Sequence, residues 1–291
     1  MVQNWNNFWE YFDEVERPVV VRKWDKSAYF YMHRHSYLEF TYVESGYGAE
    51  YVNETRYDLS PGTLSFVLPH QLHRLENSPH NPMCIYVISL RFETIFKNET
   101  LRPILDDILL SHWEVANQRV TFQGKEAKTV NYACEHMHHE YEHEHKNGHL
   151  MIQAKLAEVC IYFQRALSQK SSAESFKGNL SLNSKFYQML FYIYANYSEN
   201  ITLSKLADMY NLSPNYISSR FIKLFKQSFL AFLNDIRAKH ACYLLKTTDM
   251  KITDVSYMVG CDSYRTFLRV FYSVVGCTPS EYKSANYNIA N

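Results

Sequence analysis

The sequence predicts an α+β protein whose N-terminal part is a β-barrel with a helical pair and whose C-terminal part is all-α. Over the first 120 residues, short aromatic runs alternate with polar residues, and Gly and Pro separate these runs. Residues 124–170 change to the spacing of helices, and the last hundred residues carry one helical pattern twice. Because 291 residues can bury two separate cores, we expect two domains.

The N-terminal part contains four predicted strands. They cover residues 29–43, 49–52, 63–68 and 84–92. Turn signals stand between them at Gly46, Gly48, Pro61-Gly62 and Pro69. Several short strands with regular turns are typical of a sandwich or a barrel.

A group of polar side chains falls inside this predicted β-structure. Every second residue of a strand lies on the same face, so we expect His33, His35, Tyr37 and Glu39 to share one face. Turn glycines follow, and then His73. This order resembles the two motifs of the cupins, so the barrel is expected to be cupin-like, with these side chains at its mouth.

Three interpretations of this group stay open. In catalytic cupins the matching residues bind a divalent metal, and the corresponding set here is His33, His35, Glu39 and His73. In a regulatory protein the same positions line an effector pocket. In the third interpretation they are hydrogen-bonded residues without any ligand. We favour the effector pocket, so neither a metal nor another cofactor is expected.

Aromatic residues near these positions indicate the kind of effector. Rings stack on the C–H faces of sugars while polar groups bond their hydroxyls, so a carbohydrate fits this composition. Aromatic residues in strands are nevertheless more often part of an ordinary core. The predicted effector-binding residues are Trp24, Tyr31, His33, His35, Tyr37, Glu39 and His73.

Two helices are predicted after the barrel, joined by a turn at Lys146-Asn-Gly148. Apolar residues recur in the first helix at Val130, Cys134, Met137 and Tyr141. They recur in the second helix at Ile152, Leu156, Val159, Phe163 and Leu167. Such an antiparallel pair can serve as a helical cover over the barrel, a role that is compatible with others.

The first of these helices also contains the pattern HExxH, from His139 to His143, with His149 at the spacing of a third zinc ligand. However, Lys146 stands where the extended motif needs Gly, and the surrounding run is dense in His and Glu. A solvated, His-rich helix face is therefore the better interpretation, and no zinc hydrolase is expected.

A helix-turn-helix pattern occurs twice in the C-terminal part, over residues 201–221 and 252–271. Each copy has a short amphipathic helix, a turn of three or four residues, and a second helix that a capping residue opens. A single copy also occurs in purely structural bundles. Two copies with matched caps favour a protein that reads successive turns of DNA.

In the first copy, Ser213 and Pro214 form a strong helix start, because Ser accepts from an orphan amide and Pro fits the first helical position. Helical spacing predicts a buried face made by Ile217, Phe221, Leu224 and Phe225. The opposite face, able to reach bases or phosphates, carries Asn215, Ser218, Ser219 and Lys223.

In the second copy, Gly260 supplies the permissive turn position, and either Asp262 or Ser263 caps the next helix. Its buried face is predicted to consist of Phe267, Phe271 and Val274. Arg265 and Arg269 stand one turn apart on the exposed face. Arginine is well suited to bidentate guanine recognition, so this face is a candidate major-groove reader.

Residues 186–283 resemble the DNA-binding domain of AraC-type transcriptional regulators. Signature segments are Leu212-Ser-Pro-Asn-Tyr-Ile217, Arg237–Leu245 and Gly276-Cys-Thr-Pro-Ser-Glu-Tyr-Lys283. The resemblance implies seven helices, with Arg237–Lys246 joining the two units. It also implies base-contacting roles for Asn215, Ser218, Ser219, Tyr264, Arg265, Thr266 and Arg269. The N-terminal motifs and the helical pair resemble the sensor and dimerisation elements of the same family.

Three positions depart from the family pattern. Ser219 replaces a frequent Arg, which weakens direct base recognition by the first unit. Lys226 replaces a helix-ending Gly, which suggests a different helix end or an added phosphate contact. Cys261 replaces a Phe, so neighbouring side chains must fill the lost volume.

Charge is unevenly distributed although the formal net charge is zero. Residues 180–291 hold 12 Lys or Arg and 7 Asp or Glu, whereas residues 1–179 hold 18 and 23. A basic C-terminal part indicates that only this half meets phosphate. The six Cys include no CxxC pair, and no apolar run is long enough to span a bilayer. A cytoplasmic protein with reduced thiols is therefore expected.

The expected domains are residues 1–170 for effector binding and dimerisation, a linker at 171–182, a DNA-binding domain at 183–284 and a tail at 285–291. The expected function is a non-enzymatic, sequence-specific regulator, with activation favoured over repression. Its partners would be double-stranded DNA, a small effector, a second copy of the chain and, for an activator, RNA polymerase. The alternative is a metal-dependent cupin enzyme fused to a DNA-binding domain.

Overall fold

The computed structural model describes residues 18–25, 31–35, 37–52, 55–69, 71–91, 98–112, 118–173 and 180–287. The chain separates into two compact units, one ending at Tyr187 and one that continues from Gln188. Among the described residues, the N-terminal compact unit contains the strands and the C-terminal compact unit contains only helices, as the α+β prediction requires.

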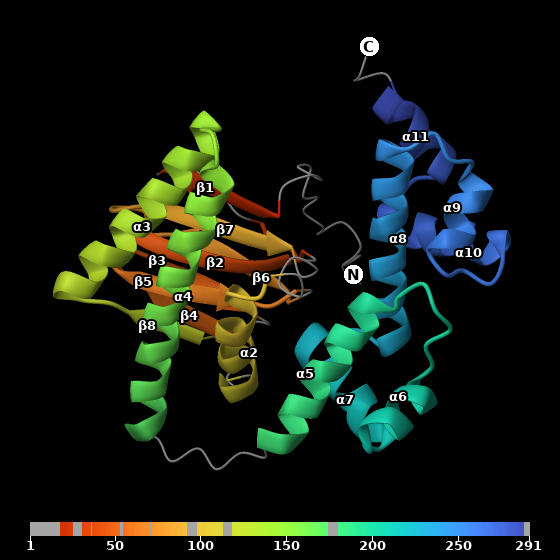
Figure 1. Ribbon diagram of the computed structural model, residues 1–291, viewed down its shortest axis with the longest axis horizontal. Helices are drawn as coiled ribbons and strands as arrows, with labels where there is room; N and C mark the ends of the chain where they lie inside the picture. Colours follow the sequence, from red (N-terminus) through yellow and green to blue (C-terminus); the bar gives the residue numbers. More distant parts are fainter. Residues whose placement is uncertain are drawn as a thin grey trace. The chain divides into compact units, whose positions relative to one another are not determined.

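Two antiparallel sheets make up the N-terminal unit (Figure 1). The five-stranded sheet has the order β1 (Val19–Trp24), β7 (Cys84–Arg91), β2 (Tyr37–Ser45), β5 (Thr63–Val67) and β8 (Gln118–Thr121). The three-stranded sheet has the order β4 (Thr55–Leu59), β3 (Gly48–Val52) and β6 (His73–Asn77). Among the described residues no strand ladder joins the two sheets. They therefore form a two-layered sandwich, the double-sheet arrangement that cupins also have.

The predicted strand at 29–43 is shorter in the structure. β2 begins at Tyr37, and His33 before it makes an isolated bridge with His73. Residues 29, 30 and 36 of that prediction lie outside the described part of the chain. The strands β1, β4, β6 and β8 were not predicted. β4, for example, is a largely exposed edge strand whose polar sequence has no apolar alternation.

The predicted helical pair is confirmed as α3 (Gly124–His143) and α4 (Gly148–Ala173), and a further helix, α2 (Leu101–His112), precedes it. Both members of the pair cover one face of the five-stranded sheet (Figure 1). The Phe40 ring of β2 lies 5.7 Å from the Phe163 ring of α4. The Tyr42 hydroxyl donates to the Ala127 carbonyl of α3 over 3.0 Å. Covering the sheet is thus one role of the pair.

The helices of the C-terminal compact unit start with α5 (Leu180–Ala195), whose first residues precede Gln188. The helices α4 and α5 extend into the predicted linker at 171–182, and residues 174–179 between them lie outside the described residues. The compact units divide after Tyr187, a few residues beyond that linker.

The helix-turn-helix units are α6 (Leu203–Tyr210) with α7 (Pro214–Phe225), and α9 (Ile252–Met258) with α10 (Tyr264–Val275). α11 (Pro279–Tyr287) closes the seven helices described in this region. α8 (Phe229–Thr247) is longer than the predicted Arg237–Lys246 and packs against both units (Figure 1). Phe232 of α8 contacts Phe221 and Phe225 of the first unit, with ring centroids 5.1 and 4.8 Å apart. The other end of α8 shares a buried cluster with the second unit, formed by Ala241, Cys242, Leu245, Val255, Val259, Cys261, Phe267 and Phe271.

The end of α7 corrects one expectation. Lys226 adopts the left-handed conformation with φ 54° and ψ 28°, and its amide donates to the Ile222 carbonyl over 3.0 Å. Gly276 ends α10 in the same region, with φ 83° and ψ −2°. The two units therefore end alike, and lysine tolerates at Lys226 the backbone that glycine normally supplies.

Replacing Lys226 with glycine is expected to raise stability by about 1 kcal/mol, because a residue with a Cβ is strained in the left-handed region. Thermal unfolding of the full chain measures this change. Lys226→Ala is the matched control, since it removes the same exposed charge but keeps the strain. A Lys226→Gly variant no more stable than Lys226→Ala would contradict the argument.

Candidate functional site

The first helix-turn-helix unit presents a polar surface on α7. Ser213 caps this helix by accepting from the Tyr216 amide at 3.2 Å. The buried face is confirmed, with Ile217, Phe221, Leu224 and Phe225 at most 4% exposed. On the opposite side Ser218 is half-buried, and the exposed residues are Asn215, Ser219, Lys223 and Lys226.

Two details limit base recognition by this helix. The Ser219 hydroxyl donates to the Tyr216 carbonyl of its own helix over 2.8 Å. Arg220, the arginine of α7, is only 6% exposed and does not belong to the exposed face. Both observations agree with the expectation that the serine at 219 weakens the first unit as a direct reader.

The second unit presents the stronger candidate surface, on α10. Ser263 is the cap, since its hydroxyl accepts from the Thr266 amide at 3.2 Å, which decides between the two predicted residues. Arg265 and Arg269 are both exposed, and Thr266 is half-buried. Two cationic side chains one turn apart can engage base edges or phosphates of a groove.

Two residues of α10 differ from their predicted environment. Tyr264 packs partly against the apolar cluster of the second unit, with its ring 6.4 Å from that of Phe267. Val274 is half-buried, while Val270 is 7% exposed and belongs to the buried face. The buried face of α10 therefore consists of Phe267, Val270 and Phe271, with Val270 in place of the predicted Val274.

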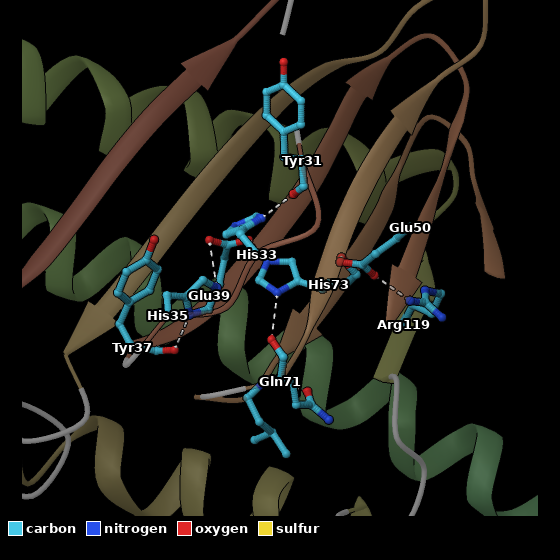
Figure 2. A network of polar contacts seen from close by, with 11 residues as sticks. Tyr31, His33, His35, Tyr37, Glu39, Glu50, Gln71, His73 and Arg119 are labelled. Atoms are coloured by element: carbon cyan, nitrogen blue, oxygen red, sulfur yellow. Dashed lines mark hydrogen bonds and ion pairs between the residues drawn. The ribbon is translucent and has the colours of Figure 1, made fainter. Parts of the chain in front are cut away.

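In the N-terminal unit, three histidines and a carboxylate converge between the sheets (Figure 2). We call His33, His35, His73 and Glu39 the histidine cluster. The Glu39 carboxylate lies 3.4 Å from His35 Nε2 and 3.5 Å from His73 Nε2. His35, Glu39 and His73 are at most 5% exposed, and His33 is half-buried. The four residues predicted as a set are thus brought together.

The surroundings of His73 favour the charged form of its imidazole. Burial lowers the pKa of His73, but the hydrogen bond and the charge of Glu39 outweigh burial, so the pKa is raised overall. Glu50 also contributes to this rise. A buried carboxylate and three imidazoles can bind a cation, a proton or the hydroxyl groups of a ligand.

The same interior holds two residues that sequence reasoning missed. Glu50 of β3 is 1% exposed and forms an ion pair with Arg119 of β8, across the two sheets. Ser65 donates to Glu50 over 3.3 Å, and Arg119 stacks on Tyr57 with 3.7 Å between guanidinium carbon and ring centroid. No local pattern marks this pair, because its members are 69 positions apart and meet only through the strand pairing.

The predicted aromatic residues lie in three different environments. Tyr37 stacks on His35, with 3.9 Å between ring centroids, and it begins the strand that carries Glu39. Tyr31 is 73% exposed and contributes its carbonyl to His33, with its ring turned away from the cluster (Figure 2). Trp24 packs instead against an apolar cluster formed by Val43, Leu59, Leu75, Met83, Ile85 and Val87.

The HExxH segment is solvated, as expected. His139 and His143 are exposed and stack on each other with centroids 4.2 Å apart. His139, Glu140 and His145 could together approach one ion, whereas His149 does not belong to that group. We call His139, Glu140 and His145 the surface histidine group. No helix among the described residues is long and apolar enough to cross a membrane.

Comparison with known proteins agrees with both halves of the fold. Residues 19–121 match the AraC-like ligand binding domain family, and residues 206–285 match a helix-turn-helix domain family. The HTH-type transcriptional activator RhaS of Enterobacter sp. (strain 638) is 24% identical over 277 residues, 94% of each chain. RhaS of Yersinia pestis (strain Pestoides F) is 25% identical over 289 residues, 94% of this chain and 97% of that one.

Among solved structures, unsaturated fatty acid bound wild-type ToxT from Vibrio cholerae strain SCE256 has a similar fold, with a TM-score of 0.51 at 14% identity. The match covers 91% of this chain and 94% of ToxT. A ligand-binding domain joined to a tandem helix-turn-helix domain defines a DNA-binding transcriptional regulator that responds to an effector. The chain belongs to the AraC family of these regulators.

Proposed function

We propose that this regulator activates transcription when a small polar effector, most simply a sugar, occupies the space between the two sheets. The observation that carries this proposal is the set of buried polar side chains between the sheets. Thr41, Ser65 and Ser89 are at most 6% exposed and lie on the same face of the five-stranded sheet as Glu39, where Ser65 donates to Glu50 of the facing sheet. A ligand rich in hydroxyl groups satisfies such groups, whereas burying an acyl chain against two carboxylates is costly. The fatty acid in ToxT is therefore not carried over to this chain.

On the DNA side, we assign direct reading to α10 and mainly backbone contacts to α7. The exposed arginines of α10 support the first assignment, and the exposed Lys223 and Lys226 support the second. The regulator would act in the cytoplasm without catalysis of its own. As an activator, like the RhaS relatives in name, it would also contact RNA polymerase.

We further propose that the chain is a homodimer through α3 and α4, and that the domain boundaries predicted above hold. Support comes from large apolar side chains that these helices leave exposed. Tyr132, Leu150 and Met151 are 56%, 55% and 41% exposed. A second copy would cover such a surface, and pairing of two chains would double the number of DNA contacts.

Replacing His33 with alanine is expected to weaken effector binding about tenfold or more, because a buried ligand group loses its partner. A thermal-shift screen of sugars and other small metabolites on the wild type identifies the effector, since a ligand stabilises the fold that binds it. The same ligand is then titrated into both proteins. His145→Ala, in the surface histidine group, is the matched control and should respond like the wild type. An unchanged affinity in His33→Ala would place the effector elsewhere, and stabilisation by fatty acids alone would contradict a sugar.

A further inference from the structure

The turn between α3 and α4 folds back on the end of α3. Glu144 ends α3 in the left-handed conformation, with φ 49° and ψ 41°, and Asn147 follows with φ 64°. The Gly148 amide donates to the His145 carbonyl over 2.8 Å, which closes the turn. This path of the backbone places the His145 side chain beside that of Glu140, five positions earlier in the chain.

The surface histidine group offers three ligand atoms to a single ion. His139, Glu140 and His145 each contribute one such atom, and the three atoms lie within 4.8 Å of one another. Glu140 Oε2 lies 3.2 Å from His145 Nδ1. Two ligands about 2.1 Å from one tetrahedral ion stand about 3.4 Å apart. The carboxylate and the imidazole are therefore spaced as two ligands of a common ion.

Glu140 is the most firmly held member of the group. Its side chain is only 13% exposed, whereas that of His145 is 49% exposed. A Cβ at Gly148 would lie 3.0 Å from Glu140 Oε2, so the glycine leaves room for the carboxylate. Glu140 and His145 also line an open cavity of about 280 Å³, together with Glu144 and His149. A carboxylate held in place loses less side-chain freedom when an ion binds than a fully solvated one does.

We propose that the surface histidine group binds one divalent transition-metal ion, which ties the end of α3 to the turn that follows it. Two imidazoles and one carboxylate suit zinc, nickel or copper, and do not suit calcium or magnesium. Three protein ligands leave a position for water or for another side chain of the cavity. The ion stabilises the helical pair, since a ligand stabilises the fold that binds it. This site shares no residue with the proposed effector site, and the inference does not depend on the function proposed above.

The proposed ligands differ from those that the HExxH pattern implies. That pattern uses its two histidines, here His139 and His143, as ligands and its glutamate as a base. In the structure His143 does not belong to the group, and Glu140 and His145 do. The His143 ring stacks on His139, and its Nδ1 donates to the His139 carbonyl over 2.9 Å. Chelation by His139 and His143 alone, one helical turn apart, is therefore the competing arrangement.

The test uses the full chain, purified without an affinity tag, stripped with a chelator and titrated with Zn²⁺ in competition with a chromophoric chelator. His33→Ala is the background protein, because the histidine cluster also contains imidazoles and must not contribute to the count. We expect one bound Zn²⁺ per chain in this background and a higher unfolding temperature. Adding His139→Ala, His145→Ala or Glu140→Gln should weaken binding at least as much as loss of an outer-shell partner does, about 10–100-fold. In the wild type, the same substitutions should lower the number of bound Zn²⁺ by one.

His143→Ala is the matched control, because it removes an exposed imidazole from the same helix and leaves the three proposed ligands in place. It should bind Zn²⁺ as the background protein does. A loss in His143→Ala as large as that in His145→Ala would assign the ion to the HExxH histidines and overturn the site. Absence of a Zn²⁺ complex in the background protein overturns it as well. Circular dichroism of each variant shows that it is folded, so a loss of Zn²⁺ reports the ligand and not the fold.

Discussion

Alanine at Arg265 or Arg269 is expected to abolish base preference at one or two operator positions, at a cost of about 1–3 kcal/mol each. The reason is geometric. Both side chains are exposed on α10, one turn apart, opposite the buried residues Phe267 and Phe271. A guanidinium reads guanine through two parallel hydrogen bonds, and alanine replaces neither. Titration of the operator selected from a genomic fragment library, together with single-base variants of it, measures the loss.

Lys223→Ala on α7 is the control for general electrostatics. It should weaken binding to operator and random DNA alike and should reduce the salt dependence, since a phosphate contact carries no sequence information. Arg265→Ala and Arg269→Ala should instead reduce the ratio of operator to random affinity. Wild-type operator affinity in both arginine variants would show that α10 does not present its exposed face to the bases.

Gly260→Ala is expected to destabilise the helical unit by about 2–5 kcal/mol, a large share of the stability of a typical domain. Two effects add. Gly260 has φ +81°, where a Cβ is strained, and that Cβ would lie 2.3 Å from the Ser198 carbonyl oxygen. The obstacle is backbone, so it cannot rotate away. Urea unfolding followed by helical circular dichroism measures the loss.

Gly276→Ala separates the two effects. Gly276 has nearly the same φ, +83°, but a Cβ there meets nothing within 4 Å. Only the backbone strain remains, at about 1–2 kcal/mol. Equal losses of unfolding free energy in Gly260→Ala and Gly276→Ala would mean that the close approach of Gly260 to Ser198 contributes nothing to the stability of the second helix-turn-helix unit.

The helical half was largely predictable because its signals are local. Ser213 caps the helix that follows it, and Ile217 and Phe221 are buried one turn apart, so adjacent residues determine each feature. The residue that could not be predicted in this way is Lys226. It adopts the left-handed conformation three residues before α8 begins, although a residue with a Cβ is strained there.

In the sandwich half, long-range pairing decides more. The alternation of side chains along a strand correctly placed Tyr37 and Glu39 on one face. The same pattern wrongly extended this strand back to His33, which instead forms an isolated bridge with His73. The histidine cluster was still found, because its members are unusual residue types in a β-rich segment. Glu50 and Arg119 escaped notice, since a lone charged residue in a strand is normally solvated and only the facing sheet buries this pair.

α8 packs against both reading units as one uninterrupted helix of 19 residues, which is about 28 Å long. A continuous helix of this kind does not change its length or twist to suit the DNA that the protein binds. One extra base pair between the two half-sites would turn the second half-site about 34° around the duplex axis. Operators of this regulator should accordingly vary more in base sequence than in the number of base pairs between their two half-sites. A genomic search for operators should therefore keep that number constant.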